Sequence, residues 1–251
     1  MFLPYGDTPN PVTATYVNWL LIGINVTVFL IVTVPLMVSQ VDLSDPLLLD
    51  YLRSYGARGL VSQQEILQNI SAYDLFVFRY GFRPAAPTLS TLMSCMFLHG
   101  SWMHLAGNML FLYIFGNNVE ARLGSLTYLL VYLVTGVVAT LFFAVFAPGS
   151  QIPLVGASGA ISGVLGCYFL WFPRNRVKTF LFLFPFLMTT VMLPARLVLG
   201  VYLIIDNLLP FIVNGGVGSG VAYGAHIGGF LGGLGLAYGF DRWQGLRRLK
   251  I

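Results

Sequence analysis

An uncharged stretch runs from Leu123 to Pro173 without a single Asp, Glu, Lys or Arg. Over all 251 residues only 9% are charged and the mean hydropathy is +0.80, whereas a soluble domain carries about 25% charged residues. About 20 apolar residues are enough to cross a hydrocarbon core of about 30 Å as a helix. The sequence therefore predicts an all-α integral membrane protein.

Six apolar segments are expected to be membrane-spanning helices. A more polar segment, 39–92, follows the first of them; its mixture of charged and apolar residues is typical of segments lying in the membrane interface. The Phe-rich segment 179–193 is interrupted by Pro185 and is expected to form an interfacial hairpin. We expect one membrane domain, 1–251, with helices at about 18–38, 93–116, 124–147, 157–172, 194–212 and 222–240.

Ser158 lies between glycines at the start of one of these apolar helices. Flanking glycines lack Cβ atoms, so another backbone could approach the hydroxyl closely. The first turn of a helix also offers unpaired N–H groups that can hold an anion. Two interpretations stay open on these residues alone: a helix cap with a packing face of glycines, or a nucleophile that takes its base from elsewhere in the chain.

Three other polar side chains interrupt the apolar helices. His104 and Asn108 are four residues apart and share one helix face, where they could form an interhelical hydrogen bond or serve a reaction. His226 lies among small residues spaced by four in the segment 222–235, which favours close packing against the glycines that follow Ser158. This packing would let His226 and Ser158 meet.

Asp206 is a carboxyl within the fifth apolar segment, and we expect it to make a structural hydrogen bond. The two cysteines, Cys95 and Cys167, are expected to be buried thiols. No Cys/His spacing of the kind that binds zinc is present.

The cations are distributed unevenly among the connecting segments. Lys and Arg mark the cytoplasmic side of membrane proteins, and 148–155 and 213–221 contain neither. An even number of spans then predicts that both termini are cytoplasmic. Nine of the thirteen cations fall on the side of the termini: Arg122, Arg174, Arg176, Lys178, Arg196, Arg242, Arg247, Arg248 and Lys250.

Four motifs, spread over about 80–240, resemble those of the rhomboid family of intramembrane serine proteases. The resemblance implies a six-transmembrane-helix rhomboid bundle. One departure stands out, because many family members carry Tyr where this chain has Ser162. The motifs are Phe97-Leu-His-Gly-Ser-Trp-Met-His-Leu-Ala-Gly-Asn108, Glu120-Ala-Arg122, Gly156-Ala-Ser158-Gly159 and Ala225-His226-Ile-Gly228.

The resemblance also implies the role of each site residue. Ser158 would be the nucleophile and His226 its base, without a carboxylate. The Ser158 N–H, His104 and Asn108 would stabilise the oxyanion. His99 would have a structural role, Glu120 and Arg122 would stabilise a turn together, and no cofactor or metal would be needed.

The implied function is a serine-type endopeptidase that cleaves transmembrane segments of single-span membrane proteins within the lipid bilayer. We expect a multi-pass protein of a bacterial plasma membrane, and no nucleic-acid partner. Two alternatives remain: a non-catalytic rhomboid-like protein that binds membrane clients, and a transporter or haem or metal protein that uses the three histidines as ligands.

Overall fold

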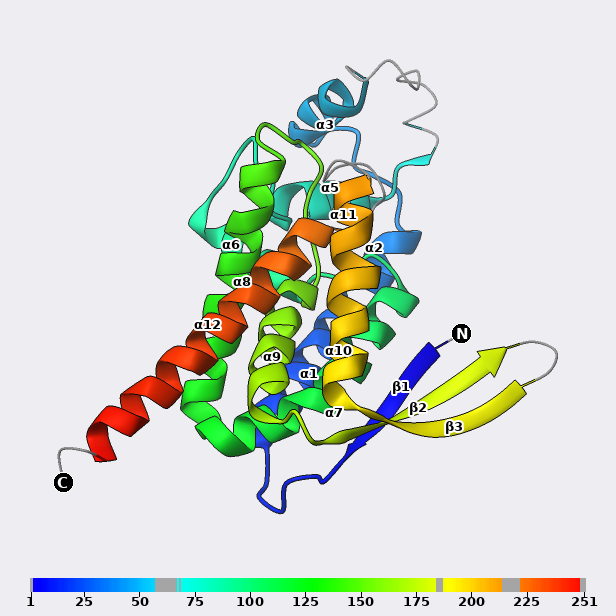
Figure 1. Ribbon diagram of the computed structural model, residues 1–251. Helices are drawn as coiled ribbons and strands as arrows, with labels where there is room; N and C mark the ends of the chain where they lie inside the picture. The colour runs from blue at the N-terminus through cyan, green and yellow to red at the C-terminus, as the bar shows by residue number, and fades with distance from the viewer. Residues whose placement is uncertain (1, 57–66, 68, 184–186, 214–221, 249–251) are drawn as a thin grey trace.

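Long helices lie side by side through most of the chain, as the computed structural model in Figure 1 shows. The structure describes residues 2–56, 67, 69–183, 187–213 and 222–248. Four helices are uninterrupted: α7 (Trp102–Leu123), α8 (Ser125–Phe146), α9 (Ser158–Trp171) and α12 (Tyr223–Arg248). Two more contain a π-helical turn: α1 (Tyr16–Val28) with η1 (Phe29–Thr33) and α2 (Val34–Val38), and α10 (Ala195–Leu203) with η3 (Ile204–Leu208) and α11 (Leu209–Val213).

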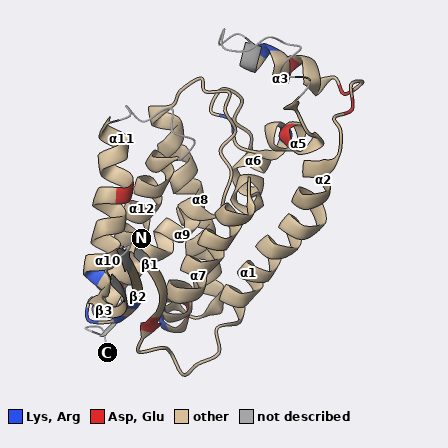
Figure 2. Cartoon of the chain, turned by 90° about the vertical axis from the view of Figure 1, so that its right-hand side faces the viewer, with Lys and Arg blue, Asp and Glu red and all other residues tan. Residues whose placement is uncertain are grey.

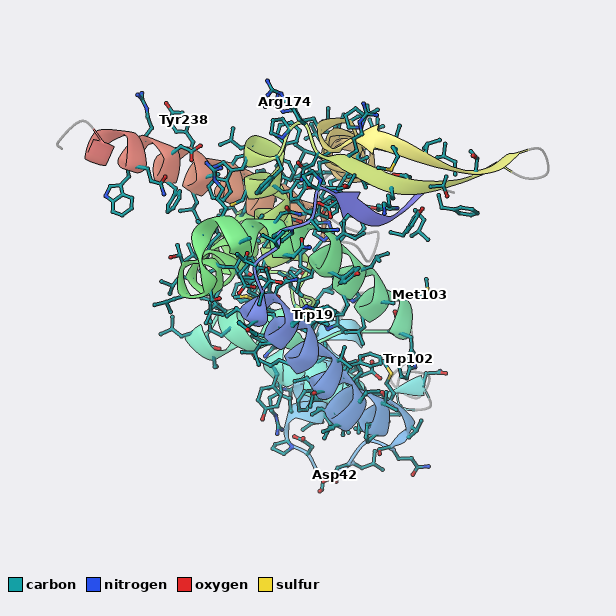
Figure 3. The ribbon with its side chains drawn as sticks, turned by 90° about the horizontal axis from the view of Figure 1, so that it is seen from below. Trp19, Asp42, Trp102, Met103, Arg174 and Tyr238 are labelled. Carbon is teal, nitrogen blue, oxygen red and sulfur yellow. The ribbon has the colours of Figure 1, made fainter. Side chains whose placement is uncertain are left out.

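The outer surface of the bundle is apolar. Within the described ranges, the segments Tyr16–Val38, Ser125–Phe146 and Ala195–Val213 are long and apolar enough to cross a membrane. Large side chains such as Trp19 and Trp102 face outward from different helices (Figure 3). Charged residues gather toward the two ends of the bundle (Figure 2). A mostly helical chain with this surface is an integral membrane protein, because exposing so much apolar area to water is unfavourable whereas lipid can cover it.

The helix predicted at 93–116 has different bounds in the structure. Its first part forms the separate short helices α6 (Leu89–Ser94) and η2 (Cys95–Phe97). The long helix α7 starts only after Ser101, whose hydroxyl accepts the His104 N–H at 3.1 Å and caps the helix. It continues to Leu123 and stops at Gly124, which has a φ of +77°. The predicted polar turn after residue 116 is therefore the end of this helix.

Glu120 and Arg122 do not pair with each other, contrary to the prediction. The buried Glu120 carboxylate accepts the N–H groups of Val17 at 3.0 Å and Asn18 at 2.7 Å, so it caps the start of α1. Arg122 instead forms an ion pair with Asp241 of α12 at 2.8 Å. The two charges thus connect α7 to two different helices.

Helices α9 and α12 pack backbone to backbone, as the spacing of small residues predicts. A Cβ atom added at Gly229 would lie 2.1 Å from the carbonyl oxygen of Gly159, and one at Gly233 would lie 1.9 Å from that of Gly163. A second stripe of glycines on α12 faces α8, where a Cβ at Gly228 would lie 2.3 Å from a carbon of Phe142. No side chain separates α9 from α12 at these positions.

A three-stranded antiparallel sheet lies at the end of the bundle where α9 ends (Figure 1). The segment predicted as a hairpin forms β2 (Arg176–Leu183) and β3 (Leu187–Pro194). The sequence did not predict the third strand, β1 (Phe2–Thr8), which pairs with β2 from Phe2 opposite Leu181 to Thr8 opposite Arg176.

Asp7 anchors this sheet to the helices. Its side chain is 2% exposed and accepts hydrogen bonds from Asn118 of α7 at 2.8 Å and from the Tyr168 hydroxyl of α9. Burial raises the pKa of the Asp7 carboxyl to about 6, although the hydrogen bond from Tyr168 acts in the opposite direction. The strand is therefore joined to the bundle by a buried polar contact.

The segment 39–92 contains short helices, α3 (Leu47–Gly56), α5 (Ala72–Tyr80) and α6. Residues of α3 and α5 form a small apolar cluster of their own, separate from the main core. Ser71 and Asp74 form a capping box at the start of α5, and Arg79 forms an ion pair with Asp45 at 2.8 Å. The described parts of this segment are therefore held together by both apolar and ionic contacts.

Candidate active site

Ser158 is the first residue of α9, and the loop before it is held in place by the backbone. The N–H of Gly156 donates to the carbonyl of Cys95 at 2.8 Å. Gly156 has a φ of +123°, which a residue with a side chain rarely adopts. The N–H of Ser158 belongs to the first helical turn and needs no partner within the helix. The loop thus presents both the hydroxyl and the amide of Ser158 at the helix start.

Ser158 and His226 are in contact although they are 68 positions apart. The Ser158 Oγ lies 2.8 Å from His226 Nε2. Both side chains are partly buried and lie near the starts of α9 and α12. The close packing of the two helices explains this short distance, as expected from their small residues.

Two residues of the α10–α11 span complete the surroundings of His226, and neither was a predicted site residue. The Asn207 Oδ1 lies 2.6 Å from His226 Nδ1. The Tyr202 ring lies beside the imidazole, with its centroid 6.3 Å away and a plane angle of 32°. The sequence does contain a polar pair, Asp206 and Asn207, within an apolar segment, but only the carboxyl of Asp206 is a candidate on charge alone.

Tyr202 occupies the space that Ser162 leaves open beside the imidazole. Its hydroxyl lies 2.7 Å from Ser162 Oγ, and Ser162 donates to the carbonyl of Ser158 at 2.7 Å. Because Ser162 is smaller than the Tyr that many family members carry, either another side chain or water could fill this space, and the structure places a side chain there. The aromatic ring therefore comes from a different helix than the family pattern implies.

His104 and Asn108 lie close to Ser158, on α7. A Cβ atom added at Gly156 would lie 2.7 Å from His104 Nε2 and 3.6 Å from Ser158 Oγ, so the two groups border the same small space. The His104 Nδ1 accepts the N–H of Gly100 at 3.4 Å, which leaves Nε2 to carry the proton. The buried Asn108 Nδ2 makes no hydrogen bond with any described residue. Two side-chain donors thus line the cavity that the Ser158 hydroxyl also lines.

The site residues line a cavity of about 810 Å³. It lies where α7, α9 and α12 begin and α8 ends. The loop 150–155 forms part of its wall. The walls are mostly apolar, and the polar groups that line the cavity include Ser158, His226, His104 and Asn108. A cavity of this size and composition can accept several residues of an apolar peptide.

Other predicted residues lie apart from this cluster. Asp206 is exposed, and the hydrogen bond expected of it is not seen among the residues that the structure describes. Cys95 and Cys167 are buried and unpaired, as predicted. His99 is fully buried, with its ring 5.1 Å from that of His104. The described part of the chain contains no group of three His, Cys, Asp or Glu that could hold a metal ion.

The arrangement is suited to acyl transfer. A hydroxyl in contact with an imidazole can be deprotonated as it attacks a carbonyl carbon. Hydrogen-bond donors on the other side of the attacking oxygen can stabilise the negative charge that forms on the carbonyl oxygen.

Comparison with known proteins matches residues 86–243, more than half of the chain, to the Rhomboid domain. Rhomboid protease GluP of Bacillus subtilis is 34% identical over 146 residues, which cover 57% of this chain and 24% of that protein. RHOMBOID-like protein 4 of Arabidopsis thaliana is 33% identical over 154 residues, 59% of this chain and 33% of that protein. The mitochondrial Rhomboid protein 1 of Saccharomyces cerevisiae is 31% identical over 99 residues, 38% of this chain and 29% of that protein.

The chain therefore spans only a quarter to a third of the length of these relatives. The matched part contains α7, α8, α9 and α12, which carry Ser158, His226, His104 and Asn108. By the extent of the domain match, the chain belongs to the rhomboid family.

Proposed function

We propose that this rhomboid protein is an active serine endopeptidase that cleaves transmembrane segments of other membrane proteins. The contact of 2.8 Å between Ser158 Oγ and His226 Nε2, at the wall of an apolar cavity, carries the proposal. Family membership supports intramembrane proteolysis in general, and the similarity to a protein named Rhomboid protease GluP points the same way.

The proposed reaction begins when His226 Nε2 takes the proton of Ser158 and the oxygen attacks the peptide carbonyl carbon. The Ser158 N–H, His104 Nε2–H and Asn108 Nδ2 donate to the resulting oxyanion. His226 then gives its proton to the leaving amine as the peptide bond breaks, which leaves an acyl-enzyme. A water molecule, deprotonated by His226, attacks the ester carbonyl, and His226 returns that proton to the Ser158 oxygen as the ester bond breaks.

The proposed substrate is a single-span membrane protein. Only an unwound segment exposes a peptide carbonyl to attack, because helical hydrogen bonds occupy the backbone elsewhere in lipid. We therefore expect cleavage near the end of the substrate helix, at residues that disfavour a helix. The mostly apolar walls of the cavity are consistent with such a peptide.

We also propose that 1–251 forms one bundle of six membrane spans, with both termini in the cytoplasm of a bacterium. The described cations at 174–178 and on Arg196 lie at the sheet end of the bundle (Figure 2), which the uneven distribution of Lys and Arg assigns to the cytoplasm. The active site would then open to the opposite side. In a cysteine-free background, a cysteine at Ser150 should react with an impermeant reagent from outside, and one at Gln244 only after permeabilisation.

The activity is tested with purified protein and a panel of single-span substrates. Ser158→Ala should abolish cleavage and also labelling by a fluorophosphonate probe, because both need the Ser158 hydroxyl. The control is Ser90→Ala, which removes an exposed hydroxyl of α6. It should leave both reactions unchanged.

Cleavage by pure Ser158→Ala would refute the mechanism. A wild-type protein that neither labels nor cleaves any substrate would instead support a role in binding membrane clients.

A further inference from the structure

Asn207 is the buried member of the otherwise exposed segment Ile204–Leu209. Its side chain is 1% exposed, whereas the preceding Asp206 faces outward. The Asn207 Nδ2 donates to the carbonyl of Tyr202, five residues earlier, at 2.7 Å. Asn207 lies in the π-helical turn η3, a type of distortion that often occurs at functional sites, and the bond joins this turn to the end of α10. The turn and the bond together direct the amide oxygen toward His226.

The hydrogen bonds fix which way the amide points. The carbonyl of Tyr202 can only accept, so the atom that faces it must be the amide nitrogen. The oxygen of Asn207 therefore faces His226 Nδ1, at 2.6 Å. A carbonyl oxygen can only accept as well, so Nδ1 must carry the proton. The neutral imidazole then has its free electron pair on Nε2, the nitrogen that contacts Ser158 Oγ.

We propose that Asn207 is a positioning residue for His226, which makes the reacting set Ser158–His226–Asn207. The inference rests on the proposed protease function. Without the amide oxygen, the neutral ring can carry its proton on either nitrogen, and only one of these forms can accept the Ser158 proton. The ring also loses the contact that opposes its rotation. When His226 becomes protonated during the reaction, the same oxygen continues to accept the Nδ1–H and stabilises the cation.

None of the charged or titratable groups described near the imidazole forms a hydrogen bond with Nδ1, so Asn207 is the residue that can orient the ring. His226 contacts Ser158 from α9 and has Tyr202 of α10 beside its ring. His104 of α7 lies beside Gly156, where an added Cβ would be 2.7 Å from its Nε2. The carboxylate of Asp206 faces outward and does not reach the imidazole. In the described part of the chain, Nδ1 has one hydrogen-bond partner, and it is the neutral amide of Asn207.

The test compares three variants. Asn207→Leu keeps a side chain of similar size but removes the acceptor. Asn207→Asp keeps an oxygen at the same place, and its second oxygen can carry a proton and donate to Tyr202. Asp206→Asn is the matched control, because it changes the adjacent exposed residue on the same turn. For each protein we would measure the rate of Ser158 labelling by a fluorophosphonate probe, kcat and KM on a single-span substrate, and thermal unfolding in detergent.

We expect Asn207→Leu to slow labelling and to lower kcat by about 10–100-fold, the usual effect of losing the partner that orients a functional histidine, while KM changes by less than about twofold. Asn207→Asp should recover most of both rates, and Asp206→Asn should match the wild type. A purely structural residue would not produce a loss confined to labelling and kcat together with recovery by aspartate.

Wild-type rates in Asn207→Leu would overturn the inference. If Asn207→Leu does not fold, the test rests on Asn207→Asp. A folded Asn207→Asp protein in which both the labelling rate and kcat stay low contradicts the inference. A wild-type protein that neither labels nor cleaves contradicts both this inference and the proposed function. Normal wild-type activity with an unaffected Asn207→Leu contradicts this inference alone.

Discussion

Replacing Gly233 by alanine tests whether the contact between α9 and α12 sets the geometry of the reacting pair. The new Cβ would lie 1.9 Å from the carbonyl oxygen of Gly163, whereas contacts below about 3 Å are not tolerated in packed interiors, so the helices must separate by about 1 Å. Gly235 is the control, because a Cβ there meets no atom within 4 Å. Both changes gain similar helix propensity, about 1 kcal/mol, so this gain cancels in the comparison.

The difference between the two variants is then the cost of overpacking, about 1–3 kcal/mol. We expect Gly233→Ala to be less stable than Gly235→Ala by this amount when both are unfolded in mixed micelles. Because a misplacement of about 1 Å in a reacting group can cost about 100-fold in rate, kcat of Gly233→Ala should fall by about 10–100-fold. Equal stability and equal kcat for the two variants would refute the argument.

Three further changes test other contacts. Gly156→Ala should lower kcat more than stability, because its Cβ would lie 2.7 Å from His104 Nε2; Gly149→Ala, which also has positive φ but open space around it, should affect stability alone. Glu120→Gln should lower the unfolding free energy by about 1–3 kcal/mol, since the hydrogen bonds to its carboxylate are charge-assisted; unchanged unfolding would contradict this. Since burial raises the pKa of Asp7 to about 6, the stability that this group contributes should fall as the pH rises through about 6. Asp7→Asn should remove that fall from the pH profile of thermal unfolding. Profiles of the same shape for the wild type and Asp7→Asn would contradict this prediction.

The long apolar helices and the pairing of Ser158 with His226 could be predicted because both depend on local patterns. Length and hydropathy locate the membrane-spanning segments. The spacing of glycines by four indicates which faces of α9 and α12 meet. Helix ends were less accurate: the polar residues at 117–122 resemble a turn in the sequence, but in the structure α7 continues through them because partners on other elements bind Asn118 and Glu120.

Strand β1 and the role of Asn207 could not be predicted for a common reason, which is that both depend on contacts between distant segments. Strand β1 is identified only by its partner β2, more than 160 residues later, and its sequence shows no clear alternation. Asn207 points at His226 only because η3 is π-helical. The sequence pattern does not distinguish such a turn from a regular helix, so it does not show that Asn207 faces His226.

The close packing of α9 against α12 has a mechanical consequence. Where Gly159 and Gly163 touch the backbone of the facing helix, no side chain can change rotamer to absorb a displacement, so the two helices must move as one stiff body. The span Ala195–Val213 is less buried: 17% of its most apolar stretch is buried, against 28% for Ser125–Phe146. We therefore expect a peptide that enters the cavity to displace this span before the pair of α9 and α12. The backbone amides of Ala195–Val213 should exchange with deuterium sooner than those of α9. When a substrate is bound, the exchange rates should change most in this span.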